Sequence, residues 1–152
     1  MTDTVAFRKP GLLERLFNHA FGVVVGLGMG PADYYVLQVR GRKTGRVYST
    51  PVNVIEVGGA RFLVAPRGRT QWVRNAEAAG EVILRKGRSR ERFRVRSVAS
   101  PDKPEILRAY LDRFRATVQR YFPVRAGSPP EAFVPIVDQY PVFELHARDA
   151  DR

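Results

Sequence analysis

Apolar and polar residues alternate in short runs between residues 34 and 99, and this period of two predicts β-strands. Five strands are expected, at residues 34–39, 47–57, 61–65, 81–86 and 90–99. Gly58-Gly59 is typical of a two-residue hairpin turn between the second and third of them. Pro51 is expected to place part of the second strand at an edge or a bulge. A final strand is predicted within residues 140–146.

The N-terminal part of the chain has a different period. Apolar residues recur every three to four positions over residues 11–30, which predicts a helix after a flexible segment at residues 1–10. A helix that covers the core is favoured, and a helix that makes peripheral contact with a membrane is the alternative. The apolar run from Ala20 to Gly30 is too short to span a membrane, which needs about 20 residues.

Two further helices are predicted downstream. The first covers residues 70–79, with Thr70 as its N-cap and Gly80 just past its end. The second covers residues 101–121 and begins with a proline, which suits the first helical turn. Residues 122–139 are rich in proline and are expected to form a connection.

Strands joined by tight turns, with few helices, indicate a mainly β protein with helices (α+β) in which an antiparallel barrel carries the helices on its surface. The strands follow one another without an intervening helix, so a Rossmann fold is disfavoured. At 152 residues the chain fits a single domain, 1–152, with the barrel core and a candidate binding site at residues 34–99.

Composition excludes several kinds of site. The chain has no cysteine, so it can form neither disulfides nor thiolate metal sites. Its two histidines, His19 and His146, lie far apart in the sequence and argue against zinc or iron. No metal site is therefore expected. A cytoplasmic location is expected, with membrane association through the N-terminal helix as the alternative.

The positive charge is concentrated in the middle of the chain. The formal net charge is +11, and residues 40–96 hold 15 Arg and Lys against four Glu, which accounts for the entire excess. A localised basic stretch predicts an anionic partner, such as a phosphate-bearing cofactor, a nucleic acid or an acidic membrane surface.

The first candidate motif is the basic turn Gly41-Arg42-Lys43-Thr44-Gly45-Arg46. Its glycines allow a tight turn, and backbone N–H groups in such a turn can bind an anion. The spacing of a Walker A loop is absent. A solvated basic turn without a ligand is an equally good interpretation of these six residues alone.

The second motif, residues 65–75, runs from a strand into the N-terminus of the predicted 70–79 helix, where orphan N–H groups favour phosphate. Arg67 and Arg69 precede that helix, and Trp72 is placed either beside a planar cofactor or in the core. The arginine-rich hairpin at residues 85–96 is interpreted mainly as a solvated strand face, with nucleic-acid contact as a less favoured alternative.

No motif for chemistry by the protein's own side chains is found. The GxSxG and HExxH patterns, a cysteine nucleophile and a clustered pair of carboxylates are all absent from the sequence. An enzyme of this composition would take its chemistry from a cofactor and supply binding, orientation and charge. No catalytic residue is assigned.

The order of these motifs resembles the deazaflavin (coenzyme F420)-dependent nitroreductase and quinone reductase family. The resemblance rests on the basic turn, on Ser49-Thr50-Pro51-Val52, on Phe62-Leu63-Val64-Ala65 and on Trp72-Val73-Arg74-Asn75, with Tyr140-Pro141-Val142-Phe143 similar to the last strand of the family. It implies a split β-barrel of the flavin-reductase or pyridoxamine-oxidase type. It also implies a deazaflavin with a phosphodiester and a glutamate tail as the cofactor.

The resemblance also implies roles for individual residues. The predicted cofactor-binding set is Arg42, Lys43, Thr44, Arg46, Thr50, Pro51, Val52, Ala65, Pro66, Arg67, Gly68, Trp72 and Asn75. Arg42, Lys43 and Arg46 would hold the phosphate and tail, and Trp72 and Asn75 would wall the pocket. The four residues between the third strand and the helix are fewer than in well-known members. Substrate-lining aromatics are sought among Tyr121, Phe122, Phe133 and Tyr140.

The function implied by the resemblance is hydride transfer from reduced deazaflavin to a small electron-poor acceptor, quinone-like or nitro-like, or to an enone. Three alternatives stay open: a flavin mononucleotide (FMN) oxidoreductase on the same barrel, a non-enzymatic deazaflavin carrier, and a nucleic-acid-binding barrel. The last is the least favoured, because residues 85–96 place only Phe93 among their charges and no specific nucleic-acid partner is expected. The oligomeric state is left open.

Overall fold

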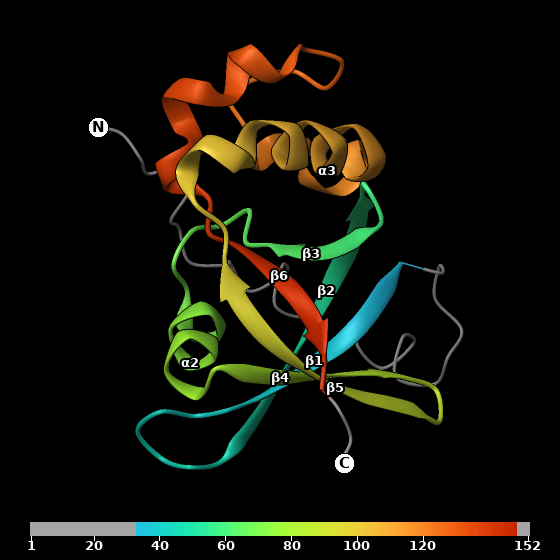
Figure 1. Cartoon of the computed structure of the whole chain (residues 1–152), viewed down its shortest axis with the longest axis vertical. Helices are drawn as coiled ribbons and strands as arrows, with labels where there is room; N and C mark the ends of the chain where they lie inside the picture. The colour runs from blue at the N-terminus through green and yellow to red at the C-terminus, as the bar shows by residue number, and fades with distance from the viewer. Residues whose placement is uncertain (1–32, 149–152) are drawn as a thin grey trace.

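The computed structural model describes residues 33–148. These residues form six strands that close into an antiparallel barrel in the order β1-β2-β3-β6-β5-β4 (Figure 1). The strands are β1 (Tyr34–Arg40), β2 (Val47–Val57), β3 (Ala60–Val64), β4 (Glu81–Lys86), β5 (Ser89–Ser97) and β6 (Val142–Ala147). The expected antiparallel barrel is therefore confirmed. The predictions for residues 1–10 and 11–30, including membrane contact, lie outside the described residues.

The long strand β2 pairs with a different neighbour along each of its two halves. Residues 47–53 pair with β1, and residues 54–57 pair with β3. Pro51 lies in the first half, opposite Val36, and there β2 has no second partner among the described strands, which suits a residue without an N–H. The turn into β3 has Gly58 and Gly59 at φ values of 60° and 83°, as the hairpin prediction requires.

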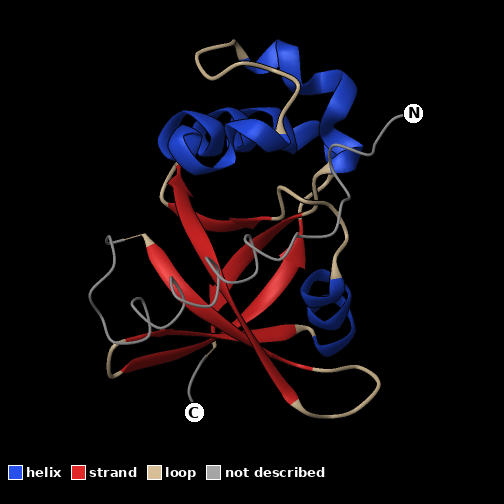
Figure 2. Cartoon of the chain, turned by 180° about the vertical axis from the view of Figure 1, so that it is seen from behind, coloured by secondary structure: helices blue, strands red, loops and turns tan. Residues whose placement is uncertain are grey.

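Helices cover the barrel at two places (Figures 1 and 2). The short helix α2 (Gln71–Ala79) connects β3 to β4. The longer helix α3 (Lys103–Val118) lies across the end of the barrel with the 3₁₀ segments η1 (Ser100–Asp102), η2 (Gln119–Tyr121) and η3 (Pro130–Gln139) around it. Within residues 33–148, no helix combines the length and the apolar character needed to cross a membrane.

Several strand and helix boundaries differ from the sequence-based prediction by one or two residues, and the 101–121 helix and the 122–139 connection differ more. The 101–121 helix is α-helical only over α3, with 3₁₀ turns before and after it. The connection at 122–139 contains η3, which the prediction missed. Pro129 and Pro130 are compatible with the start of a helical turn, since φ near −65° suits it, and the amide of Ala132 closes that turn on the carbonyl of Pro129 at 3.0 Å.

Side chains pack in two apolar clusters. One fills the barrel and includes Leu37, Leu63, Val73 and Phe93. The other lies between the barrel and the helices α3 and η3. Tyr121, Phe122, Phe133 and Tyr140 all belong to this second cluster, where Phe122 stacks on Tyr140 with ring centroids 4.4 Å apart and the Tyr140 hydroxyl donates to the Tyr121 carbonyl at 2.5 Å. These four aromatics are buried core residues and line neither of the two cavities described below.

Candidate functional site

The turn between β1 and β2 is held closed by its own backbone. The Gly41 amide donates to the Arg46 carbonyl at 2.6 Å, and the Gly45 amide donates to the Gly41 carbonyl at 3.0 Å. Tyr48 packs directly over Gly41: a Cβ at that position would lie 2.5 Å from Cε2 of the tyrosine ring. The Tyr48 hydroxyl also bonds Oγ1 of Thr44 at 3.1 Å. Glycine at position 41 therefore allows Tyr48 to close the turn.

A second turn carries the chain from β3 into α2. The Gly68 amide donates to the Ala65 carbonyl at 3.1 Å, and Gly68 has a φ of 86°, a conformation that favours glycine. Thr70 occupies the N-cap position, as predicted, but its side chain makes no capping hydrogen bond. The helix ends at Gly80, whose φ of 75° is the expected left-handed cap.

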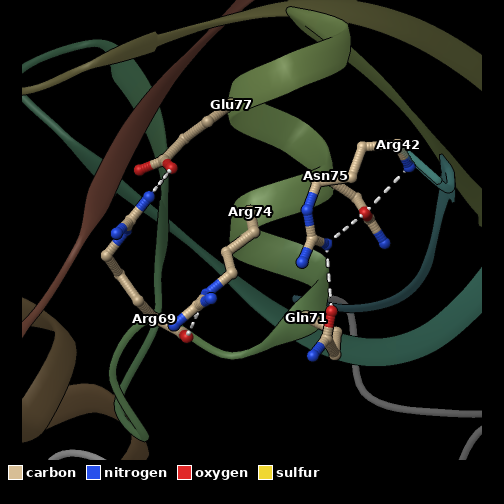
Figure 3. A network of polar contacts seen from close by, with 6 residues as sticks. All are labelled: Arg42, Arg69, Gln71, Arg74, Asn75 and Glu77. Atoms are coloured by element: carbon tan, nitrogen blue, oxygen red, sulfur yellow. Dashed lines mark hydrogen bonds and ion pairs between the residues drawn. The ribbon is translucent and has the colours of Figure 1, made fainter.

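Asn75 joins α2 to the basic turn (Figure 3). Its side-chain oxygen accepts the Arg42 amide at 3.0 Å and an Arg42 guanidinium nitrogen at 2.8 Å, and the same nitrogen donates to Gln71 at 2.9 Å. Asn75 is only 5% exposed. Because both of these bonds need an acceptor, the oxygen must face Arg42, and the Asn75 NH₂ group is left facing away from it as a donor.

Arg69, in the turn before α2, and Arg74, on α2, have other hydrogen-bond partners than Arg42. Arg69 forms an ion pair with Glu77 at 2.5 Å, and this contact raises the pKa of the Arg69 guanidinium. Nε of Arg74 donates to the Arg69 carbonyl at 3.3 Å (Figure 3). The Arg69 side chain is thus held by a carboxylate of α2, and the Arg74 side chain by a backbone carbonyl just before α2.

A cavity of about 600 Å³ opens between the basic turn, the first half of β2 and the start of α2. It is lined by Val39, Gly41, Arg42, Lys43, Thr44, Tyr48, Ser49, Thr50, Arg67, Arg69, Thr70, Gln71, Trp72, Arg74 and Asn75. Five of these residues are cationic and none is acidic. Trp72 and Val39 supply an apolar wall, where Trp72 packs against Phe143 with ring centroids 6.0 Å apart.

Seven of the predicted site residues line this cavity: Arg42, Lys43, Thr44, Thr50, Arg67, Trp72 and Asn75. The other six, Arg46, Pro51, Val52, Ala65, Pro66 and Gly68, are not among its lining residues. Arg46 is exposed on the basic turn, Val52 packs against the barrel core, and Ala65 is buried there at 1% exposure. The structure thus brings the two basic motifs together but leaves six of the thirteen predicted residues, among them Pro51 and Val52 on β2, outside the lining.

Sequence reasoning left several lining residues out of the predicted set, among them Tyr48, Ser49, Gln71, Arg69 and Arg74. Ser49, Arg69 and Arg74 lie within motifs already noted in the sequence, and Gln71 had a signal of its own. Gln71 and Asn75 are four residues apart on a predicted helix and so share a face. Tyr48 had no such signal, because its place over Gly41 depends on how the turn closes.

The arrangement suits an anionic ligand with a planar apolar part. The N-terminus of a nine-residue helix and five cations point to negative charge. The half-buried indole of Trp72 and the side chain of Val39 suit a ring system. Among the described residues no three side chains of metal-binding type come together.

Similar solved structures support the fold. An F420-H2-dependent reductase is 16% identical with a TM-score of 0.50, covering 76% of this chain and 95% of its own. A candidate 5-nitroimidazole antibiotic resistance protein of Bacteroides thetaiotaomicron is 12% identical with a TM-score of 0.54, covering 86% and 80%. A candidate pyridoxamine 5'-phosphate oxidase of Listeria innocua is 7% identical with a TM-score of 0.51, covering 77% and 85%. The barrel is therefore of the pyridoxamine-oxidase type.

No curated protein matches the chain. A family model does: residues 14–126 match that of the F420H2-dependent quinone reductases. This match takes in both basic motifs, all of the cavity lining and the whole of α3. The cofactor that the family uses, reduced coenzyme F420, fits the cationic cavity with its apolar wall. The chain belongs to the F420H2-dependent quinone reductase family and is a deazaflavin-dependent oxidoreductase.

Proposed function

We propose that the 600 Å³ cavity holds coenzyme F420 and that a small electron-poor acceptor, a quinone, an enone or a nitro compound, is reduced there. The observation that carries this proposal is the lining of the cavity: five cations, of which Arg69 is paired with Glu77 outside the lining, no lining carboxylate and an apolar wall. A ligand with several negative charges and a planar ring system matches both parts of that lining.

The anionic part of the cofactor is assigned to Lys43 and Arg67, which line the cavity on the two basic motifs. Lys43 makes no hydrogen bond or ion pair within residues 33–148 and is therefore the freer cation of the basic turn. Arg42 is assigned a positioning role, because its guanidinium is engaged by Gln71 and Asn75. Arg46, outside the lining, adds only to the local positive potential.

The ring is assigned to the apolar wall beside Trp72, with Thr50 on the neighbouring strand and the NH₂ group of Asn75 as a fixed donor to a ring or side-chain oxygen. Val52 and Ala65 belong to the same apolar cluster as Trp72 and are assigned to the support of this wall, whereas Pro51, Pro66 and Gly68 are assigned no contact with the ring. The protein's contribution is thus to fix the ring, exclude water from one side of it and neutralise its charged chain.

When bound, the reduced deazaflavin supplies a hydride. Reduction of a quinone to a hydroquinone also needs one proton for the hydride adduct, and this proton is assigned to solvent or to the Tyr48 hydroxyl, the tyrosine that lines the cavity. No obligate acid–base residue is required of the chain. An FMN ligand has a single phosphate, so a lining of five cations, only Arg69 of which is paired with Glu77, favours the longer anionic chain of F420 over FMN.

The test is the oxidation of reduced F420 by purified protein with a soluble quinone, an enone and a nitroaromatic offered in turn. Turnover with at least one acceptor is expected. It is measured as the increase in the absorbance of oxidised F420. Reduced FMN in place of reduced F420 is the matched comparison, and faster turnover with it would contradict the cofactor assignment. Tight binding of F420 without turnover on any acceptor would favour a carrier over a reductase.

A further inference from the structure

A second cavity, of about 480 Å³, lies next to the first and shares Arg69 and Arg74 with it. Its other walls come from the end of β5, the start of α3 and the end of η3. Residues far apart in sequence, including Glu77, Lys103 and Asp138, meet there. Of the predicted site residues only Gly68 lines this space, and the proposed hydride transfer does not use it.

Lys103 is the unusual residue of the second cavity. It is the first residue of the 16-residue helix α3 and is only 8% exposed. A cation at a helix N-terminus faces the positive end of the helix dipole, and burial adds a desolvation cost. That desolvation lowers the pKa of the Lys103 ammonium. Such a placement is unfavourable unless an anion offsets it.

The protein's own carboxylates offset this charge only in part: Asp138 attracts the Lys103 ammonium and raises its pKa, but by less than desolvation lowers it. Glu77 is paired with Arg69 at 2.5 Å, and Oδ1 of Asp138 accepts the Ser100 hydroxyl at 2.7 Å. Lys103 donates to a neutral group, the Val137 carbonyl, at 3.1 Å, which leaves two ammonium hydrogens for other acceptors. Arg74 bonds a carbonyl through Nε alone. Within residues 33–148, neither Lys103 nor Arg74 forms an ion pair.

We propose that the second cavity binds an oxyanion, a carboxylate or a phosphate, held between Lys103 and Arg74. Two sources have this chemistry. One is the anionic side chain of F420 itself, since Arg74 borders both cavities and a chain leaving the first would meet the second; this source rests on the proposed function. The other is a separate small carboxylate or phosphate compound that binds beside the cofactor. Charge-assisted hydrogen bonds from Lys103 and Arg74 would hold either one.

The experiment compares the parent protein with Lys103→Gln and Arg74→Gln. Glutamine at position 103 keeps an N–H donor for the Val137 carbonyl and removes the charge. Arg115→Gln is the matched control, because Arg115 is an exposed arginine of the same helix that lines neither cavity. Each protein is titrated with inorganic phosphate by thermal unfolding at constant ionic strength. Each is also titrated with F420 and with a deazaflavin that lacks the anionic chain.

A phosphate-dependent rise in the unfolding midpoint, present in the parent and control and lost in both variants, supports the site with a separate ligand as the source. A preference for F420 over the chain-less deazaflavin that falls about tenfold or more in both variants supports the cofactor as the source. If phosphate stabilises no protein and the preference is the same in all four, the proposal is overturned. Failure of the parent to bind any deazaflavin would instead contradict the proposed function, and the phosphate titration would still decide on the site.

Discussion

Trp72 is the single tryptophan of the chain, and its partly buried side chain both packs against the barrel core and lines the cavity. If the ring of F420 lies along this wall, indole emission should fall on binding, because the two ring systems come within a few ångströms. Trp72→Phe should weaken binding only modestly, since an aromatic contact is worth about 0.5–1.5 kcal/mol beyond its area. A fluorescence titration measures both.

The same titration can contradict a role of Trp72 in cofactor binding. Unchanged emission at saturating F420, with binding verified by equilibrium dialysis, would leave the indole as a core residue. In that case Trp72→Ala should lower the free energy of unfolding by about 3–5 kcal/mol, the range for truncating a large core aromatic.

Lys43 and Arg46 are two cations of one turn that differ in their relation to the cavity, which Lys43 lines and Arg46 does not. Lys43→Ala should therefore weaken F420 binding, and by a larger factor at low salt than at high salt, because the contact is Coulombic and exposed. Arg46→Ala should have a smaller effect at every salt concentration. Equal affinity of Lys43→Ala and parent throughout a salt titration would contradict the role of Lys43.

Asn75 is a buried polar residue whose oxygen accepts two hydrogen bonds from Arg42. Asn75→Leu should leave the Arg42 amide and guanidinium without that acceptor and cost about 1–3 kcal/mol of unfolding free energy, measured by denaturant titration. Asn75→Asp keeps the acceptor oxygen for Arg42 and should retain most of the stability. It replaces the NH₂ donor by a second oxygen, however, and should still weaken F420 binding. Full affinity in Asn75→Asp would show that the NH₂ group contacts no ligand.

At the scale of elements, the strands were predictable because turn residues bound each of them and apolar and polar residues alternate along them. Residues 81–86 were predicted as they are observed in β4, and the 70–79 helix differs from α2 by one residue. The 3₁₀ segment η3 was missed because its prolines are typical of a connection. It is stabilised by Phe133 and Val137, which pack in the same apolar cluster as α3, and a contact between distant segments leaves no local sequence pattern. Lining residues such as Tyr48 were missed for the same reason, since they are set by contacts between elements.

We expect F420 binding to depend on how tightly the basic turn closes. A Cβ added by Gly41→Ala would meet the Tyr48 ring at 2.5 Å and Oγ1 of Thr44 at 2.9 Å, both side-chain atoms. Tyr48 is 42% exposed and can turn outward, so we expect little loss of thermal stability but several-fold weaker F420 binding. Tyr48→Phe removes only the bond to Thr44 and should bind F420 nearly as well as the parent. An unfolding scan and a binding titration separate the two effects, and unaltered binding in Gly41→Ala would contradict the need for close packing.

The whole molecule carries a net charge of +11, and part of it lies on the outer face of β5, where Arg90, Arg92, Arg94 and Arg96 are exposed. Two features limit this face as a nucleic-acid surface. Arg96 pairs with Glu144 at 3.2 Å, and Arg94 lies opposite Glu81 on β4, so carboxylates interrupt the positive charge. Phe93, the aromatic residue in this run, is buried inside the barrel and offers no stacking surface.

We therefore expect only weak binding to random DNA, with a dissociation constant on the order of 10⁻⁴–10⁻⁶ M at physiological salt and a steep loss as salt rises. The variant Arg92→Gln/Arg94→Gln should bind DNA more weakly, with a shallower dependence on salt, because fewer phosphate contacts release fewer counterions. It should bind F420 as the parent does, since neither arginine lines the cavity. Fluorescence anisotropy with a labelled random duplex measures the first effect, and the indole titration measures the second. Binding near 10⁻⁸ M that survives physiological salt would be of the strength expected for a specific site, and would mean that the arginine face recognises nucleic acid independently of the cofactor.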